Sequence, residues 1–456
     1  MSTPGIVVAA PASGSGKTTI ATGLMGALRR AGHQVAPFKV GPDFIDPGYH
    51  GLAAGRPGRN LDPVLVGDHL IGPLYRHGSA DCDIAVVEGV MGLFDGRISD
   101  APAAGAARGS TAHVAGLLGT PVILVVDARG QSHSVGALVH GFATFDSSVR
   151  LVGVILNRVG SARHEAVLRQ GCEQAGIAVL GAVPRTDELT VPSRHLGLVT
   201  AVEHGRRAGD AVDAMTELVA RHVDIGAVAA AARSAVADDP WSPHVCESAG
   251  PPLTVALAAG RAFTFNYAEH AELLSAAGAD VVAFDPLTEP PPPGTAALVI
   301  PGGFPEEFGQ ELSANRAARE QIAALADSGA PIHAECAGLA YLADDLDGHP
   351  MCGVIGGSAS FTPSLTLGYR DAVAVTDSAL HRIGDRAVGH EFHRTAMHYG
   401  PDRQPAWRYR GRDGAMVDDG AVRAGVHAGY LHIHPAAHPE AIARFVRAAA
   451  RSKLAG

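Results

Sequence analysis

The chain has 456 residues, of which 46% are hydrophobic and 18% charged, a balance that excludes disorder over most of its length. At roughly 100–200 residues per domain, this length predicts two to four domains. The formal net charge is −10 and no block of Lys and Arg stands out, which argues against nucleic acid as a partner.

No apolar run reaches the roughly 18 residues that a membrane-spanning helix needs, and no charged-then-apolar segment begins the chain. We therefore expect a cytoplasmic protein with no membrane partner. The five cysteines are widely spaced and form no CxxC pair, which argues against a disulfide framework or a structural zinc site.

The first half of the chain alternates short apolar runs with helical patterns. Because nearly every residue of these runs is apolar, they are typical of strands that are buried on both faces. They lie at residues 6–10, 35–40, 84–87, 122–126, 151–156 and 179–183, with helices predicted over 18–30 and 164–175. This alternation predicts an α/β domain with a mostly parallel sheet.

A glycine-rich segment, PASGSGKTT at residues 11–19, follows the first predicted strand and leads into a helix. Glycines let backbone N–H groups converge on phosphate oxygens, and the helix N-terminus favours negative charge. The segment predicts a nucleotide site in which Lys17 reaches the terminal phosphates and the Thr18 hydroxyl holds Mg²⁺. A turn that only opens a structural helix is the alternative. The residues expected to bind ATP are Gly14, Ser15, Gly16, Lys17, Thr18 and Thr19.

Polar residues stand at the ends of the next predicted strands, where a nucleotide site in an open sheet belongs. Glu88 ends one strand and is a natural Mg²⁺ ligand or water anchor. Lys39 lies in the strand that leads into Asp43, and Asp62 is a further candidate; for any single carboxylate, surface solvation is the alternative. Asn157 could read a nucleotide base or could simply form a turn.

The character of the sequence changes near residue 226. An Ala-rich stretch and two proline-containing segments predict a linker over 227–252, between domains at 1–226 and 253–456. Strands are expected at 253–257, 281–284, 297–300 and 332–334, with helices at 268–277 and 317–328 between them. A second α/β domain is the simplest account.

The segment PIHAECAGL at residues 331–339 places Cys336 between an apolar strand and a helical stretch. A nucleophile on a sharp strand-to-helix turn is accessible, and the helix dipole favours its thiolate. Such a thiol needs a base from elsewhere, and the best candidates are the histidines of GYLHIHP at 429–435. A buried, inert cysteine is the alternative.

A glycine pair precedes the cysteine by about thirty residues, in PGGFPE at 301–306. This turn could aim the backbone N–H groups of Gly302 and Gly303 at an oxyanion, partnered by the N–H of Ala337. The histidine-rich tail invites a metal interpretation, but GHEFH at 389–393 is not the helical HExxH pattern, and we expect no catalytic metal there.

Taken together, an ordered series of motifs resembles the cobyrinic acid and hydrogenobyrinic acid a,c-diamide synthase family. The resemblance covers nearly the whole chain, from about Val7 to Pro439. The first domain is similar to dethiobiotin synthetase and partition-type ATPases, and the second to class I glutamine amidotransferases. The motifs are APASGSGKTT, KVGPDFIDPGYH, EGVMGLFDG, ILNRVG, VPSRHLGL, PGGFPEE, HAECAGLAYL, GHEFHRT and YLHIHP.

The resemblance implies a ligase of cobalamin biosynthesis that amidates the a and c acetate groups of hydrogenobyrinic or cobyrinic acid. ATP would phosphorylate a carboxylate of the substrate, and ammonia would displace the phosphate. Cys336 would attack glutamine, with His432 as its base, to liberate that ammonia. The implied partners are ATP, Mg²⁺, L-glutamine and a corrinoid polycarboxylic acid, and a homodimer is a further expectation.

The family pattern also implies roles in the first domain. The phosphate loop and Glu88 would bind ATP and Mg²⁺. Asp43, with Lys39 before it, falls in the segment that places the acidic substrate. Asp62 is a metal ligand only by analogy with dethiobiotin synthetase.

The third member of the cysteine–histidine machinery stays open. Class I amidotransferases usually carry Glu two residues after the histidine, where this chain has His434. Either Cys336 and His432 act as a pair, or another carboxylate such as Glu391 orients His432. Rival functions are cobyric acid synthase, Ni-sirohydrochlorin a,c-diamide synthase and, from another class, a partition-type switch ATPase.

Overall fold

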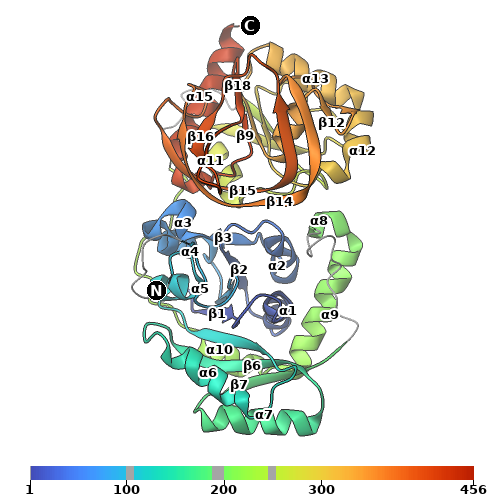
Figure 1. Cartoon of the computed structure of the whole chain (residues 1–456). Helices are drawn as coiled ribbons and strands as arrows, with labels where there is room; N and C mark the ends of the chain where they lie inside the picture. The colour runs from blue at the N-terminus through green and yellow to red at the C-terminus, as the bar shows by residue number, and fades with distance from the viewer. Residues whose placement is uncertain (1, 99–106, 187–199, 245–252, 456) are drawn as a thin grey trace. The chain divides into compact units, whose positions relative to one another are not determined.

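The protein is described here by a computed structural model covering residues 2–98, 107–186, 200–244 and 253–455. The motif VPSRHLGL at 191–198 lies outside these ranges. The chain divides into two compact units, Met1–Ser242 and Pro243–Gly456, which Figure 1 colours from blue to green and from yellow to red. In the described part of the chain, no helix is both long and apolar enough to cross a membrane.

The first unit is built on a parallel sheet, and the described strands run in the order β3-β2-β4-β1-β5-β6-β7. The six strands predicted from apolar runs are all present, and the short β3 was not predicted. The bounds are β1 Gly5–Ala9, β2 Val35–Val40, β3 Arg59–Leu61, β4 Ile84–Glu88, β5 Val122–Asp127, β6 Leu151–Val159 and β7 Val179–Pro184.

Helices pack on this sheet, and α1 also packs against α9. Gly23 and Gly26 permit that contact, because a side chain at Gly23 would overlap the backbone of Met215 and one at Gly26 would overlap Thr216. The bounds are α1 Lys17–Arg30, α2 Asp46–Ala54, α3 Pro63–Val66, α4 Ile71–Gly78, α5 Thr111–Leu118, α6 Ser134–Thr144, α7 Ala162–Gln174, α8 Ala201–His204, α9 Arg206–His222 and α10 Ile225–Ala231.

The first unit extends past the boundary predicted at residue 226. After α10, Arg233 exchanges two backbone hydrogen bonds with Gly5, and the Trp241 N–H donates to the Pro73 carbonyl at 2.9 Å. These bonds tie residues 227–242 to the first unit, so the predicted linker over 227–252 is too long at its start. Residues 245–252 lie outside the described part of the chain.

The second unit contains a sheet in the order β18-β19-β11-β10-β8-β9, parallel except for the β18–β19 pair. Its four predicted strands are present as β8 to β11. The bounds are β8 Leu253–Ala258, β9 Ala279–Phe284, β10 Ala297–Ile300, β11 Ile332–Glu335, β18 Ala421–Arg423 and β19 Val426–Gly429. The helices are α11 Ala268–Ala276, α12 Gly309–Ala314, α13 Arg316–Asp327, α14 Ala337–Leu342 and α15 Pro439–Ala455.

A further sheet in this unit was not predicted. It is largely antiparallel, in the order β13-β12-β14-β16-β17, with β15 paired along β14. Trp407 on β16 lies in its buried core with 1% of its surface exposed. The bounds are β12 Asp345–Leu346, β13 His349–Pro350, β14 Gly357–Ala374, β15 Arg386–Tyr399, β16 Trp407–Arg410 and β17 Met416–Asp419.

Candidate active sites

The phosphate loop has the backbone geometry that its sequence predicts. Gly14 and Gly16 adopt positive φ angles of 77° and 97°, and α1 begins at Lys17 directly after Gly16. Such angles suit glycine because a Cβ atom would be strained there. The loop therefore presents the N-terminus of a 14-residue helix, where backbone N–H groups and the helix dipole favour a phosphate.

Asn157, at the carboxyl end of β6, contacts this loop. Its side-chain Nδ2 donates to the Ser15 carbonyl at 2.9 Å, and a side chain at Gly16 would overlap the amide. Asn157 thus holds the phosphate loop in place. Its suggested contact with a nucleotide base stays a prediction.

Lys17 is a buried lysine on the first turn of α1. Its Nζ donates to the Met91 carbonyl at 2.5 Å. Burial lowers the pKa of Lys17, and the nearby Glu88 carboxylate opposes that effect only in part. The amine is therefore held on the loop following β4. Thr19 lies half-buried on the same turn of α1.

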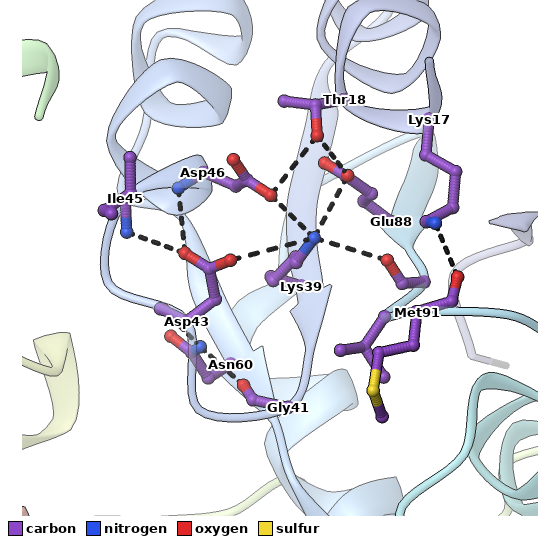
Figure 2. A network of polar contacts seen from close by, with 12 residues as sticks. Lys17, Thr18, Lys39, Gly41, Asp43, Ile45, Asp46, Asn60, Glu88 and Met91 are labelled. Carbon is purple, nitrogen blue, oxygen red and sulfur yellow. Dashed lines mark hydrogen bonds and ion pairs between the residues drawn. The ribbon is translucent and has the colours of Figure 1, made fainter. Parts of the chain in front are cut away.

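A network of charged groups lies beside the loop (Figure 2). The Thr18 hydroxyl lies 2.7 Å from Glu88 Oε1 and 3.3 Å from Asp46 Oδ2. Lys39 Nζ lies 2.7 Å from Asp46 Oδ2 and 3.0 Å from Glu88 Oε1, and 3.9 Å from Asp43. Carboxyl ends of parallel strands meet at one edge of a sheet, so β2 and β4 bring Lys39 and Glu88 together.

The buried charges in this network stabilise one another. Burial alone would lower the pKa of Lys39, but Asp46, Glu88 and Asp43 raise it well above its usual value. Burial would likewise raise the pKa of Glu88, but Lys39 and His50 hold it well below its usual range. The network therefore keeps an ammonium and a carboxylate ionised in a buried setting.

Two members of this network were missed by sequence reasoning. Asp46 lies beside Thr18 and Glu88, and burial and the neighbouring Asp43 raise its pKa. His50 is fully buried on α2, with its Nε2 2.6 Å from Glu88 Oε2. The spacing of Asp46 and His50, at i and i+4, was the available signal, since it places them on one side of α2.

The two other predicted carboxylates differ in their surroundings. Asp43 accepts hydrogen bonds from the backbone N–H groups of Ile45 and Asp46, and so shapes the turn that leads into α2. Asp62 is buried and caps α3, where its Oδ1 accepts from Val64 N at 2.8 Å. That capping contact gives Asp62 a structural task, and its role as a metal ligand stays a prediction.

In the second unit, Cys336 lies on the predicted strand-to-helix turn. β11 ends at Glu335, α14 begins at Ala337, and Cys336 itself has φ 51° and ψ −100°. A non-glycine residue with positive φ is strained, and such strain clusters at functional sites. The turn is fixed by the Cys336 N–H, which donates to the Gly429 carbonyl at 2.8 Å.

The thiol of Cys336 is buried, with 1% of the residue exposed, and its Sγ lies 3.6 Å from the Phe392 carbonyl. Burial raises the pKa of Cys336, and the Glu306 carboxylate adds to that effect. Hydrogen bonds from the backbone N–H groups of Gly303 and Ala337 oppose it. Both of these predicted oxyanion donors are therefore directed at the sulfur, and the resting thiol needs a base to become a thiolate.

His432 follows β19 and is fully buried. Its ring lies beside Gly302, because a Cβ atom there would overlap His432 Cε1 and would lie 3.1 Å from Nε2. Its backbone pairs with that of His390 on β15 through two hydrogen bonds of 2.9 Å. Since Gly303 adjoins Gly302, the imidazole, the glycine turn and the thiol belong to one site.

The carboxylate closest to His432 is not one that the sequence suggested. Glu391 binds elsewhere: its Oε2 lies 2.6 Å from Arg370 Nε and its Oε1 accepts from the Tyr409 hydroxyl at 2.7 Å. Glu335 Oε2 lies 3.4 Å from His432 Nδ1. The sequence feature that could have indicated Glu335 is its position directly before Cys336.

Comparisons with known proteins match both halves of the chain to described families. Residues 6–199 match the CobQ/CobB/MinD/ParA nucleotide binding domain family, and residues 254–440 match the CobB/CobQ-like glutamine amidotransferase domain family. The hydrogenobyrinate a,c-diamide synthase of Mycobacterium tuberculosis (strain H37Rv) is 71% identical over 448 residues, which is 98% of each chain. That of Streptomyces coelicolor is 53% identical over 97% of each chain. The cobyrinate a,c-diamide synthase of a Synechococcus species is 36% identical, over 97% of this chain and 98% of that one.

The two matched domains define the class of protein: an ATP-using ligase in which a nucleotide-binding domain is joined to a glutamine amidotransferase domain. Within that class, the chain belongs to the hydrogenobyrinate and cobyrinate a,c-diamide synthase family. Both the resemblance and the expectation of two α/β domains are thereby confirmed.

Proposed function

We propose that this enzyme uses ATP and glutamine to amidate the a and c acetate groups of hydrogenobyrinic acid, the cobalt-free corrinoid. The observation that carries the proposal is the presence, in one chain, of a phosphate loop beside an acidic network and a thiol on a strained turn. Relatives named for hydrogenobyrinate are 47–71% identical to this chain, whereas those named for cobyrinate are 36–39% identical. This difference supports the cobalt-free substrate.

In the first unit, a substrate carboxylate oxygen attacks the γ-phosphorus of ATP and ADP leaves, which forms an acyl phosphate. Ammonia then attacks the acyl carbon, and phosphate departs with the former carboxylate oxygen. Lys17 and the phosphate loop hold the terminal phosphates, where positive charge stabilises the transferring group. Lys39 and Asp43 lie at the strand end where an acidic substrate would approach.

The oxygen-rich part of the network is suited to Mg²⁺. Thr18 Oγ1, Glu88 Oε1 and Asp46 Oδ2 converge, and hydroxyl and carboxylate oxygens are the ligands that this ion prefers. These residues would hold the ion, and Asp46 is a second carboxylate that the sequence did not suggest. When bound, Mg²⁺ supplies positive charge to the phosphates.

In the second unit, Cys336 attacks the amide carbon of glutamine as its proton passes to His432. The resulting oxyanion accepts hydrogen bonds from the Gly303 and Ala337 N–H groups. His432 returns the proton to the departing nitrogen, which leaves ammonia and a thioester. Water then hydrolyses the thioester to glutamate and restores the thiol.

The decisive experiment compares Cys336→Ala with the unaltered enzyme in two assays, one supplied with glutamine and one with ammonia. We expect the variant to lose amidation with glutamine and to keep it with ammonia, because only the nitrogen supply is removed. A partition-type switch ATPase would amidate in neither assay, which would refute the proposal.

The substrate is tested by offering cobalt-free and cobalt-containing acids with ATP and glutamine and resolving the products by mass. A diamide from the cobalt-free acid supports the proposal. Activity restricted to Ni-sirohydrochlorin, or amidation of other side chains as by a cobyric acid synthase, would overturn it.

ATP and glutamine are metabolites of the cytoplasm, so we place the reaction there. The homodimer stays a prediction.

A further inference from the structure

We propose that Glu335, the residue immediately before Cys336, is the carboxylate that orients His432 for glutamine hydrolysis. The inference rests on the proposed roles of Cys336 and His432 and adds the third group that those roles leave unassigned. Glu335 would be a positioning residue, since it acts through the imidazole and touches neither glutamine nor the thiol.

The first observation is the contact itself. Glu335 Oε2 lies 3.4 Å from Nδ1 of His432, although 97 residues separate them in the chain. An ionised carboxylate only accepts hydrogen bonds, so the proton of this bond belongs to His432 Nδ1. That tautomer leaves Nε2 as the basic nitrogen, and the Cε1–Nε2 edge is the one that faces Gly302.

The second observation is that the carboxylate is itself fixed. Its other oxygen, Oε1, lies 3.4 Å from the backbone N–H of Ile433 and 3.4 Å from His333 Nε2. Burial alone would raise the pKa of Glu335, but its hydrogen bonds with His333 and His432 hold that pKa well below the usual range. Glu335 is therefore an oriented anion.

The third observation is how the fold delivers this carboxylate. β11 and β19 are parallel neighbours in which Glu335 pairs with Gly429, three residues before His432. Cys336 follows Glu335 directly and its N–H bonds to the Gly429 carbonyl. One strand end thus supplies both the nucleophile and the group that orients its base.

Glu391, which the sequence suggested, and His434, which stands at the usual position of the third group, have other contacts. Glu391 bonds to Arg370 and Tyr409. His434, which stands where amidotransferases of this class usually carry Glu, packs its ring against Tyr267 and has its Nδ1 3.3 Å from Ala436 N. Neither geometry offers a carboxylate to His432 Nδ1 as Glu335 does.

The test uses the full-length enzyme with Glu335→Gln, Glu335→Asp, Glu391→Gln and His333→Gln. We expect Glu335→Gln to lower kcat for glutamine hydrolysis on the order of 10²-fold with little change in KM, because the base loses its orientation after substrate has bound. Glu335→Asp should recover part of kcat. Ammonia-dependent amidation should remain unchanged in both variants.

Two controls separate positioning from structural support. His333→Gln removes the other imidazole on Glu335 but leaves the contact with His432, so it should lower kcat much less than Glu335→Gln. A merely structural Glu335–His333 pair would make the two losses equal. Iodoacetamide labelling of Cys336, followed by mass spectrometry of its peptide, should slow in Glu335→Gln only. If Glu335→Gln fails to fold, Glu335→Asp takes its place. A lower kcat in Glu335→Asp than in His333→Gln supports the inference, and an equal or higher kcat overturns it.

The outcomes distinguish this inference from the proposed function. A normal kcat in Glu335→Gln, or an equal loss in Glu391→Gln, overturns the role of Glu335 while Cys336 and His432 keep theirs. Glutamine hydrolysis that survives Cys336→Ala would instead refute the proposed function itself.

Discussion

The two candidate sites stabilise reactive groups in opposite ways. In the first unit, Lys39 lies among three carboxylates, and the charges of Lys39 and Glu88 stabilise each other. In the second unit, Cys336 lies in an apolar cluster on a strained backbone, and burial keeps its thiol protonated. Ion pairs therefore stabilise the reactive groups of the first site, whereas backbone geometry and hydrogen bonds position those of the second.

This difference predicts how each site responds to substitution. Removing one charge from a buried ion network leaves its partners uncompensated, which destabilises the fold. Removing a neutral thiol leaves only a small cavity. Function and stability should thus be coupled in the first unit and separable in the second.

The largest effect should come from Lys17→Ala. The variant loses the amine expected to hold the terminal phosphates, so amidation should fall on the order of 10³-fold with either nitrogen donor. Glutamine hydrolysis should continue, because its chemistry lies in the other unit. The measurement is product formation with glutamine and with ammonia, beside glutamate release. If ammonia restored amidation by Lys17→Ala, the assignment of Lys17 to the amidation site would be wrong.

A large stability effect should follow from Lys39→Met. This change leaves Asp46, Glu88 and Asp43 without their shared cation, and we expect a loss of about 4 kcal/mol in the free energy of unfolding, measured by denaturant titration. Arg30→Ala is the matched control, since Arg30 pairs with Asp213 in a solvent-exposed setting. Its loss should stay below about 1 kcal/mol. Equal losses would remove the proposed contrast between buried and exposed pairs.

The smallest effect concerns Glu306, near the thiol. Burial raises its pKa to about 7 from the usual 4.5. Between these values the unfolded chain is ionised and the folded chain protonated, so Glu306 makes stability fall as pH rises through that window. Glu306→Gln should match the unaltered enzyme below pH 4.5 and exceed it by up to about 3 kcal/mol above pH 7. The measurement is the thermal midpoint of both proteins across this pH range. A difference between them that does not change with pH would show that Glu306 does not titrate there.

The sequence predicted those parts of the fold that local pattern determines. Nearly continuous apolar runs identified β1, β2 and β4, because strands that are buried on both faces have few polar positions. The long β14 and β15 were missed, since many of their residues are half-exposed and their pairing joins segments that carry no tight-turn signal. Residues 227–242 resembled a linker because alanine and proline do not reveal a packing partner.

The sites follow the same rule. Lys17 and Cys336 were found because each sits in a contiguous motif at a strand-to-helix turn. Asp46 and Glu335 were missed because their importance lies in contacts made across the fold: Asp46 with Thr18, and Glu335 with His432. Glu391 was named as one carboxylate that could orient His432, whereas in the fold it contacts Arg370 and His393.

The packing of the segment after α10 has a practical consequence. It anchors Trp241 in the first unit, while Trp407 is the only other tryptophan of the chain and lies within the second. Each unit therefore carries its own intrinsic fluorophore. Replacing either indole by phenylalanine would leave an intact polypeptide whose emission reports the melting of a single half.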